Sequence, residues 1–168
     1  MPPLTPAAAA ADPALIRAAA LFAPALALVA ALALRRPTAA DTAAAVVATA
    51  WSAATVFALN IAALRLGWWT FDAHGAVVRG VPADLWLGWS LLWGALPAVL
   101  IRTLPATLVV AVLAWLDLIL MPPAEPVVRL GGAWLLGEGA GIAACLVPAV
   151  ALARWTRLDR HRPVRAAA

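Results

Sequence analysis

The chain has 168 residues, of which 65% are hydrophobic and only 12% are charged, whereas about a quarter of the residues in a soluble globular domain are charged. This composition excludes a soluble domain and predicts a membrane protein. The net charge of +4 comes from twelve arginines and eight carboxylates, and the arginines lie between hydrophobic runs rather than on one soluble patch. We therefore expect no nucleic-acid partner.

Five hydrophobic segments can be separated, because a transmembrane helix needs about 20 apolar residues. They cover residues 15–34, 43–64, 85–101, 103–121 and 127–153. A basic tail, residues 154–168, follows the last of them. The sequence predicts an all-α fold, a polytopic transmembrane bundle of about five helices that forms a single integral membrane domain.

The third and fourth spans come from one nearly continuous apolar run, Leu85 to Met121. As a single helix this run would measure about 55 Å, nearly twice the thickness of the hydrocarbon core. Arg102 is the only charge near its middle, and Pro97 and Pro105 flank it. We therefore predict that the chain reverses direction at Arg102.

The orientation follows from the arginines, because cytoplasmic loops carry the excess of positive charge. The tail of residues 154–168 contains five arginines. With five spans, a cytoplasmic tail also places Arg35, Arg36 and Arg102 in the cytoplasm, and the loop of residues 68–84 outside. The absence of lysine and tyrosine, with much alanine, suggests a GC-rich bacterial genome. We therefore expect a bacterial plasma-membrane protein with its N-terminus outside.

Glu138 lies about eleven residues into the predicted fifth span, which would put it about 16 Å deep. A charged residue at mid-helix costs about 2.5 to 3.5 kcal/mol, so Glu138 should face other helices and be protonated or paired. Trp134, one turn earlier, could donate its indole N–H. Glu138 could contact a substrate, proton or head group, or be a neutral bridge between helices. Gly137 and Gly141 favour close packing, and Pro148 predicts a kink.

Acid–base chemistry would depend on carboxylates, so Asp117 and Glu138 are the candidate catalytic residues. Asp117 could instead form an ion pair with Arg129 across the proline-rich turn, or join Glu138 in a polar cavity that opens outward. The sequence contains no glycine-rich phosphate loop and no His/Cys cluster with metal-ligand spacing. We therefore expect neither a cofactor nor a metal.

Three tryptophans follow Asp84, a candidate helix N-cap, at positions that share one helical face. This aromatic stripe could stack on a prenyl or polyene chain, although such stripes more often pack against a helix or lipid. Asn60 in the second span and Asp72 in the outer loop are polar residues that could also contact a ligand. The candidate binding residues are Trp86, Trp89, Trp93, Trp134, Asp72 and Asn60.

Residues 67–71, 80–89, 115–118 and 134–138 together resemble the membrane region that precedes the catalytic part of some actinobacterial isoprenylcysteine carboxyl methyltransferase-like proteins. The likeness covers most of residues 60–165. In that family a later segment with an arginine-asparagine-proline type motif handles the methyl donor, and nothing in this sequence matches it. The resemblance therefore implies a partner that is methyltransferase-like.

A second likeness is to membrane carotenoid-modifying proteins, which share an aromatic-Phe-Asp loop, a Gly-Val-Pro turn and an aspartate before a proline. Here the matching residues are 69–72, 80–82 and Asp117 with Pro122. The paired glutamates of the cyclase type are missing. This likeness implies an enzyme that acts on an isoprenoid or carotenoid.

Three functions are compatible with these features. The leading hypothesis is an accessory membrane domain that binds membrane lipid or an isoprenoid and belongs to a methyltransferase-like system. The alternative is a membrane-embedded isoprenoid- or carotenoid-modifying enzyme that uses Asp117 and Glu138 as acid and base. The third is a small proton-coupled transporter with Glu138 as proton carrier, which the lack of a visible inverted repeat disfavours.

Overall fold

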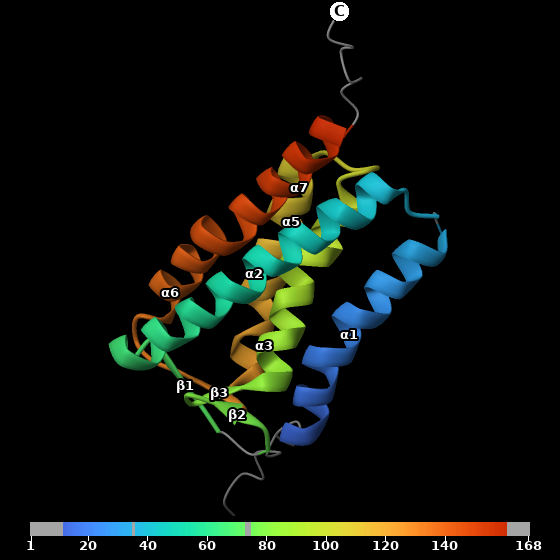
Figure 1. The fold of residues 1–168 in the computed structure, drawn as a ribbon. Coiled ribbons are helices and arrows are strands. Elements are labelled where there is room, and N and C mark those ends of the chain that lie inside the picture. Colours follow the sequence, from blue (N-terminus) through green and yellow to red (C-terminus); the bar gives the residue numbers. More distant parts are fainter. Residues whose placement is uncertain (1–11, 35, 73–74, 161–168) are drawn as a thin grey trace, which may run out of the picture.

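The structure, a computed structural model, describes residues 12–34, 36–72 and 75–160. It is a bundle of helices with two small antiparallel sheets at one end (Figure 1). In chain order the elements are α1 (Pro13–Leu34), α2 (Ala39–Leu66), β1 (Trp69–Phe71), β2 (Val77–Val78), β3 (Val81–Pro82), α3 (Ala83–Ser90), η1 (Leu91–Ala95), α4 (Leu96–Leu100), α5 (Ala106–Leu120), η2 (Pro122–Ala124), β4 (Val128–Leu130), α6 (Trp134–Gly141), η3 (Ile142–Leu146) and α7 (Val147–Arg160). η2 is a 3-10 turn, and η1 and η3 are π-helical turns within longer helices.

Among the described residues, four helical stretches are long and apolar enough to cross a bilayer. They are α1, α2, the stretch from Ala83 to Leu100 and the stretch from Trp134 to Leu158. The fifth, α5, is apolar, but its fifteen residues measure only about 22 Å. The predicted all-α helical bundle is confirmed, and the apolar helices make the chain a multi-pass membrane protein.

The predicted reversal near Arg102 is also confirmed. α4 ends at Leu100, the chain turns, and α5 begins at Ala106. α1 begins at the end of the bundle that carries the sheets, called the sheet end below, and α7 finishes at the opposite end, called the arginine end (Figure 1). The described chain therefore enters and leaves the bundle at opposite ends.

The last predicted span, residues 127–153, becomes helical only at Trp134, where α6 begins. The prediction that its helix starts at residue 127 was therefore wrong. Val128–Leu130 instead forms β4, which pairs antiparallel with Trp69–Phe71. Hydropathy alone does not distinguish a short apolar strand from a helix. The β-branched Val127 and the pair Gly131–Gly132 bound this segment, and both features are typical of a strand and its end.

An ion pair joins α1 to α3 at the sheet end. Arg17 donates through Nε to Asp84 Oδ2 at 2.7 Å and through Nη2 to Asp84 Oδ1 at 2.9 Å. Asp84 lies inside the first turn of α3, whose N-cap is Pro82, so its prediction as the N-cap was wrong. Its Oδ1 nevertheless accepts the Leu85 amide N–H at 3.0 Å, because carboxylates bind free amides in a first helical turn.

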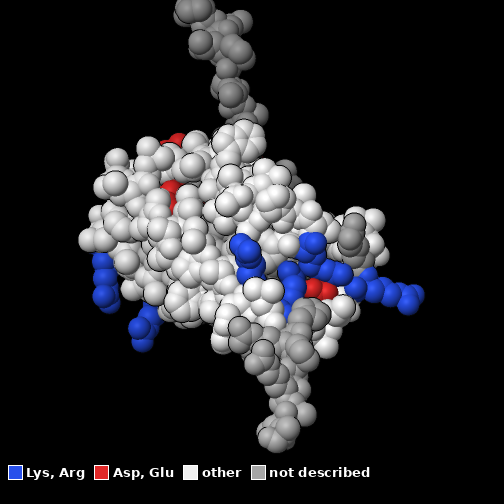
Figure 2. All heavy atoms as spheres, turned by 90° about the horizontal axis from the view of Figure 1, so that it is seen from above, with Lys and Arg blue, Asp and Glu red and all other residues white. Residues whose placement is uncertain are grey.

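A second charged cluster ties three segments together at the arginine end. Asp41 forms a capping box with Thr38 at the start of α2. Its carboxylate lies 3.3 Å from Arg102 Nη1 and 2.9 Å from Arg157 Nε. The Arg157 Nε–H does not point at the carboxylate and forms no hydrogen bond with it. Arg157 Nη2 also donates to the Ala98 carbonyl at 2.7 Å. α2, α7 and the turn after α4 are thereby joined around one carboxylate, and Figure 2 shows blue arginines gathered beside red acidic atoms at this end.

Each π-helical turn is followed directly by an α-helix whose second residue is a proline. η1 ends two residues before Pro97, and η3 ends two residues before Pro148. Proline has no amide hydrogen, so Pro148 cannot bond the carbonyl of Ala144, and Trp51 Nε1 donates to that carbonyl at 3.2 Å instead. The irregularity predicted at Pro148 therefore takes the form of a π-helical turn.

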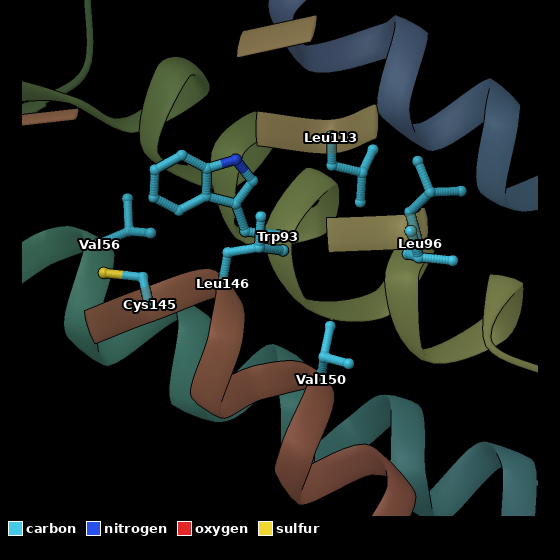
Figure 3. Close-up of a cluster of buried hydrophobic side chains, with 8 residues drawn as sticks. Val56, Trp93, Leu96, Leu113, Cys145, Leu146 and Val150 are labelled. Atoms are coloured by element: carbon cyan, nitrogen blue, oxygen red, sulfur yellow. The ribbon is translucent and has the colours of Figure 1, made fainter. Parts of the chain in front are cut away.

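The central apolar core is built around the ring of Trp93. In Figure 3 this ring lies between Val56 and Cys145 on one side and Leu113 on the other. Cys145 is buried, as expected for a small apolar residue. The core joins α2, the π-helical turns and α5. It lies beside the polar site described below.

α1 crosses α3 where Gly88 meets the backbone of Ala20. A Cβ atom at position 88 would lie 2.1 Å from the Ala20 carbonyl oxygen. We expect Gly88→Ala to lower the free energy of unfolding by about 2 kcal/mol, because the two helices must separate. Denaturation in mixed micelles, followed by circular dichroism, measures this.

The matched control for this substitution is Gly139→Ala. A Cβ atom at position 139 meets nothing within 4 Å, and alanine favours helix over glycine by about 1 kcal/mol. We expect this variant to be as stable as the wild type or slightly more stable. Equal unfolding curves for Gly88→Ala and Gly139→Ala would contradict the close crossing.

Candidate functional site

Two buried carboxyl groups meet between α5 and α6. Asp117 and Glu138 are each 3% exposed, and their side chains lie within hydrogen-bonding range of each other. Of the two arrangements considered for Asp117, the structure has the pair with Glu138. Arg129 is exposed on β4 and forms no ion pair with Asp117 among the described residues, so the predicted pair across the turn was wrong.

The carboxyl pair lies near the sheet end of the bundle rather than at its middle. Glu138 is the fifth residue of α6, and Asp117 is one turn from the end of α5 at Leu120. The depth of about 16 Å predicted for Glu138 assumed a helix that begins at residue 127. Because the helix begins at Trp134, Glu138 is only about 6 Å along the helix axis from its start.

The carboxyl oxygens of the pair can accept more hydrogen bonds than the neighbouring side chains donate to them. Trp89 Nε1 donates to Asp117 Oδ1 at 3.2 Å. Among the described residues, Asp117 Oδ2 and Glu138 Oε2 have no donor. A single proton between the two carboxyls would supply one, since a protonated carboxyl donates and an ionised one accepts.

Two other tryptophans, Trp93 and Trp134, donate no hydrogen bond to the pair among the described residues. Trp93 Nε1 is buried and has no acceptor among the described residues. Trp134 was expected to donate to Glu138, but no such hydrogen bond forms in the described part of the chain, and Trp134 packs instead against the apolar cluster that contains Trp69, Met121 and Val127. Trp134 is the first residue of α6.

The glycines on either side of Glu138 allow indole rings to approach α6. A Cβ atom at Gly137 would lie 2.4 Å from the ring of Trp69, and one at Gly141 would lie 2.8 Å from the ring of Trp93. The close packing predicted from the Gly137–Gly141 spacing is therefore present. Its partners are side chains of tryptophan rather than the backbone of a neighbouring helix.

Asn60 completes the buried polar cluster from α2. It is 1% exposed, donates through Nδ2 to the Val56 carbonyl at 2.9 Å, and accepts from Trp69 Nε1 at 2.9 Å. A cavity of about 10 Å³, enough for one water-sized group, adjoins this cluster. Its lining residues are Val56, Leu59, Asn60, Trp69, Trp89, Trp93 and Glu138.

The structure separates the remaining candidate binding residues from this cavity. Trp86 donates to the Ala53 carbonyl at 2.8 Å and packs against Phe57. Asp72 follows β1 at the sheet end, where its amide donates to the Val127 carbonyl at 2.9 Å. Trp86 and Asp72 therefore have structural contacts of their own.

Comparisons with protein-family models, curated proteins and solved structures gave no match to this chain. Within residues 12–34, 36–72 and 75–160, no three His, Cys, Asp or Glu side chains are grouped as a metal ion would require. The polar cluster itself is therefore the feature from which a function can be inferred. Its members are the Asp117–Glu138 pair, Asn60, Trp69, Trp89 and Trp93.

Proposed function

We propose that this chain is an accessory domain of the bacterial plasma membrane that binds a lipid or isoprenoid, and that the Asp117–Glu138 pair receives the polar end of the bound molecule. The observation that supports this most is that Trp93 Nε1 has no acceptor among the described residues, next to carboxyl oxygens that can still accept a hydrogen bond even if they share one proton. Buried polar atoms are normally hydrogen-bonded, and each unpartnered one costs about 1–3 kcal/mol. A ligand could recover this cost.

A hydroxyl group fits these atoms best. It carries one donor and two acceptor lone pairs, which match carboxyl oxygens of Asp117 or Glu138 and the indole N–H of Trp93. A hydroxyl also takes about the room of one water molecule, and the cavity offers about 10 Å³. We therefore favour a lipid or isoprenoid alcohol over a molecule with a large charged head group.

The apolar chain of such a ligand would run along the outside of α5 and α6. The two helices meet at few points, one of which is the carboxyl pair. Beside this contact α5 exposes Leu120, three residues after Asp117, and α6 exposes Leu135, three residues before Glu138. A prenyl chain in this position would remain in contact with lipid while its alcohol reaches the pair.

The test is equilibrium binding of a prenyl alcohol, geranylgeraniol, to the purified protein in detergent. We expect Glu138→Gln and Asp117→Asn to weaken binding about tenfold, as the loss of about 1.4 kcal/mol of hydrogen bonding would. Glu125→Gln, which changes an exposed acid, is the matched control and should bind like the wild type. If all three variants bind like the wild type, the pair is not the site.

The accessory role requires a partner, and the resemblance to the membrane region of methyltransferase-like proteins supports one. We expect the tail of residues 154–168 to face the cytoplasm and the sheet end to face outward, as the excess of arginine at the opposite end favours. The neighbouring reading frame, or an extended gene, should encode a methyltransferase segment. Its absence in related genomes would remove this part of the proposal.

A second candidate is a membrane enzyme that isomerises an isoprenoid or carotenoid, and the contact between the two carboxyls favours it. A protonated carboxyl could add a proton at one carbon while the ionised carboxyl removes a proton from another, so that substrate and product are isomers. Replacing Asp117 by asparagine or Glu138 by glutamine should abolish product without lowering membrane yield. Unchanged product would exclude this function.

A further inference from the structure

A second apolar pocket lies at the arginine end, between α1 and the turn that follows α4. Its volume is about 130 Å³. Apolar side chains from both helices and the polar residues of the turn surround it, namely Ala31, Leu34, Val99, Leu100, Arg102 and Thr103. This pocket lies far from the carboxyl pair, which is near the sheet end.

The way α1 packs explains why a pocket forms here. α1 touches α3 backbone to backbone at Ala20 and Gly88, in the half of α1 nearer the sheet end. In its 18-residue apolar window only 6% of residues are buried, so α1 lies at the edge of the bundle, although it contacts α3, η1 and α4. Near Ala31 and Leu34 the bundle leaves a gap that lipid would reach from the membrane.

The charges at the mouth of this pocket favour an anion. Two arginines, Arg102 and Arg157, contact Asp41, the carboxylate of this cluster, and Arg36 takes part only through its backbone carbonyl. Arg102 contacts Asp41 at 3.3 Å and the Arg36 carbonyl at 3.5 Å, both through Nη1, and its side chain is 20% exposed. Its remaining N–H groups can bind a phosphate, whose geometry matches a guanidinium.

We propose that this pocket binds one anionic phospholipid, with the phosphate on Arg102 and one acyl chain between α1 and α4. Basic pockets between transmembrane helices bind anionic lipid head groups in this way. The site is separate from the proposed isoprenoid site. Its ligand would fasten the loosely packed end of α1 to the bundle.

The test is thermal unfolding in a neutral detergent with added phosphatidylglycerol or phosphatidylcholine of the same acyl chains. We expect phosphatidylglycerol to raise the Tm, and phosphatidylcholine or inorganic phosphate to have little effect. Ala31→Phe should block the pocket, so that at least ten times more phosphatidylglycerol is needed for the same rise in Tm. Its matched control, Ala30→Phe on the exposed face of α1, should respond like the wild type.

The role of the charge is tested separately. Arg102→Gln should reduce the phosphatidylglycerol effect, whereas Arg129→Gln, an exposed arginine at the sheet end, should not. If Arg102→Gln does not fold, native mass spectrometry of Ala31→Phe and Ala30→Phe still decides, because only Ala30→Phe should retain a bound phosphatidylglycerol. Equal effects of both lipids, or equal losses in the two arginine variants, would overturn the proposal.

Discussion

Replacing Asp41 by alanine is expected to lower the free energy of unfolding by about 3 kcal/mol. The substitution removes the shared partner of Arg102 and Arg157 and leaves two partly buried guanidinium groups close together. Breaking a buried ion pair costs about 3–5 kcal/mol, and we take the lower value because both arginines are partly exposed. Loss of the capping box with Thr38 adds to the effect.

Unfolding in mixed micelles of sodium dodecyl sulfate, followed by circular dichroism, would measure this change. Glu125→Ala removes an exposed carboxylate and should change stability by less than about 0.5 kcal/mol. Adding Arg157→Met to Asp41→Ala should recover part of the loss, because one unpaired charge is then removed. An Asp41→Ala variant as stable as Glu125→Ala would show that the cluster does not hold this end together.

Replacing Glu138 by alanine should also cost about 3 kcal/mol. The variant leaves the buried carboxyl of Asp117 without its partner and enlarges the cavity beside Trp93. An unpartnered buried polar group costs about 1–3 kcal/mol, and a new cavity adds a further penalty. The same unfolding experiment measures it.

Glu138→Gln separates the structural contribution of this residue from its role in binding. The glutamine amide has almost the same size and can donate to Asp117, so we expect stability within about 1 kcal/mol of the wild type. Prenyl alcohol binding should nevertheless fall. If Glu138→Ala proves as stable as Glu138→Gln, the contact between the two carboxyls contributes nothing to the fold.

Hydropathy and charge were sufficient to predict the helical bundle. The reversal at Arg102 follows from physical length, because the apolar run is too long for one crossing. The start of the last span was missed because Val128–Leu130, apart from Arg129, continues the apolar sequence that leads into α6. Its pairing with Trp69–Phe71 joins segments far apart in sequence. That error also placed Glu138 too deep.

The site was predicted in part. Carboxyl groups are rare inside apolar segments, so Asp117 and Glu138 stand out from the sequence alone. Their contact depends on the relative heights of α5 and α6, which sequence periodicity does not give. Trp69 was missed because it belongs to a loop-like stretch, and only the fold brings its indole N–H to Asn60. The Arg17–Asp84 pair likewise joins positions 67 residues apart.

The central claim is that a ligand alcohol reaches the carboxyl pair between α5 and α6. Photo-crosslinking with a prenyl alcohol that carries a diazirine beside its hydroxyl tests it most directly. We predict adducts on peptides covering residues 106–120 and 134–146, at yields that fall at least tenfold in Glu138→Gln. Adducts elsewhere only, or an unchanged yield in Glu138→Gln, would contradict the account.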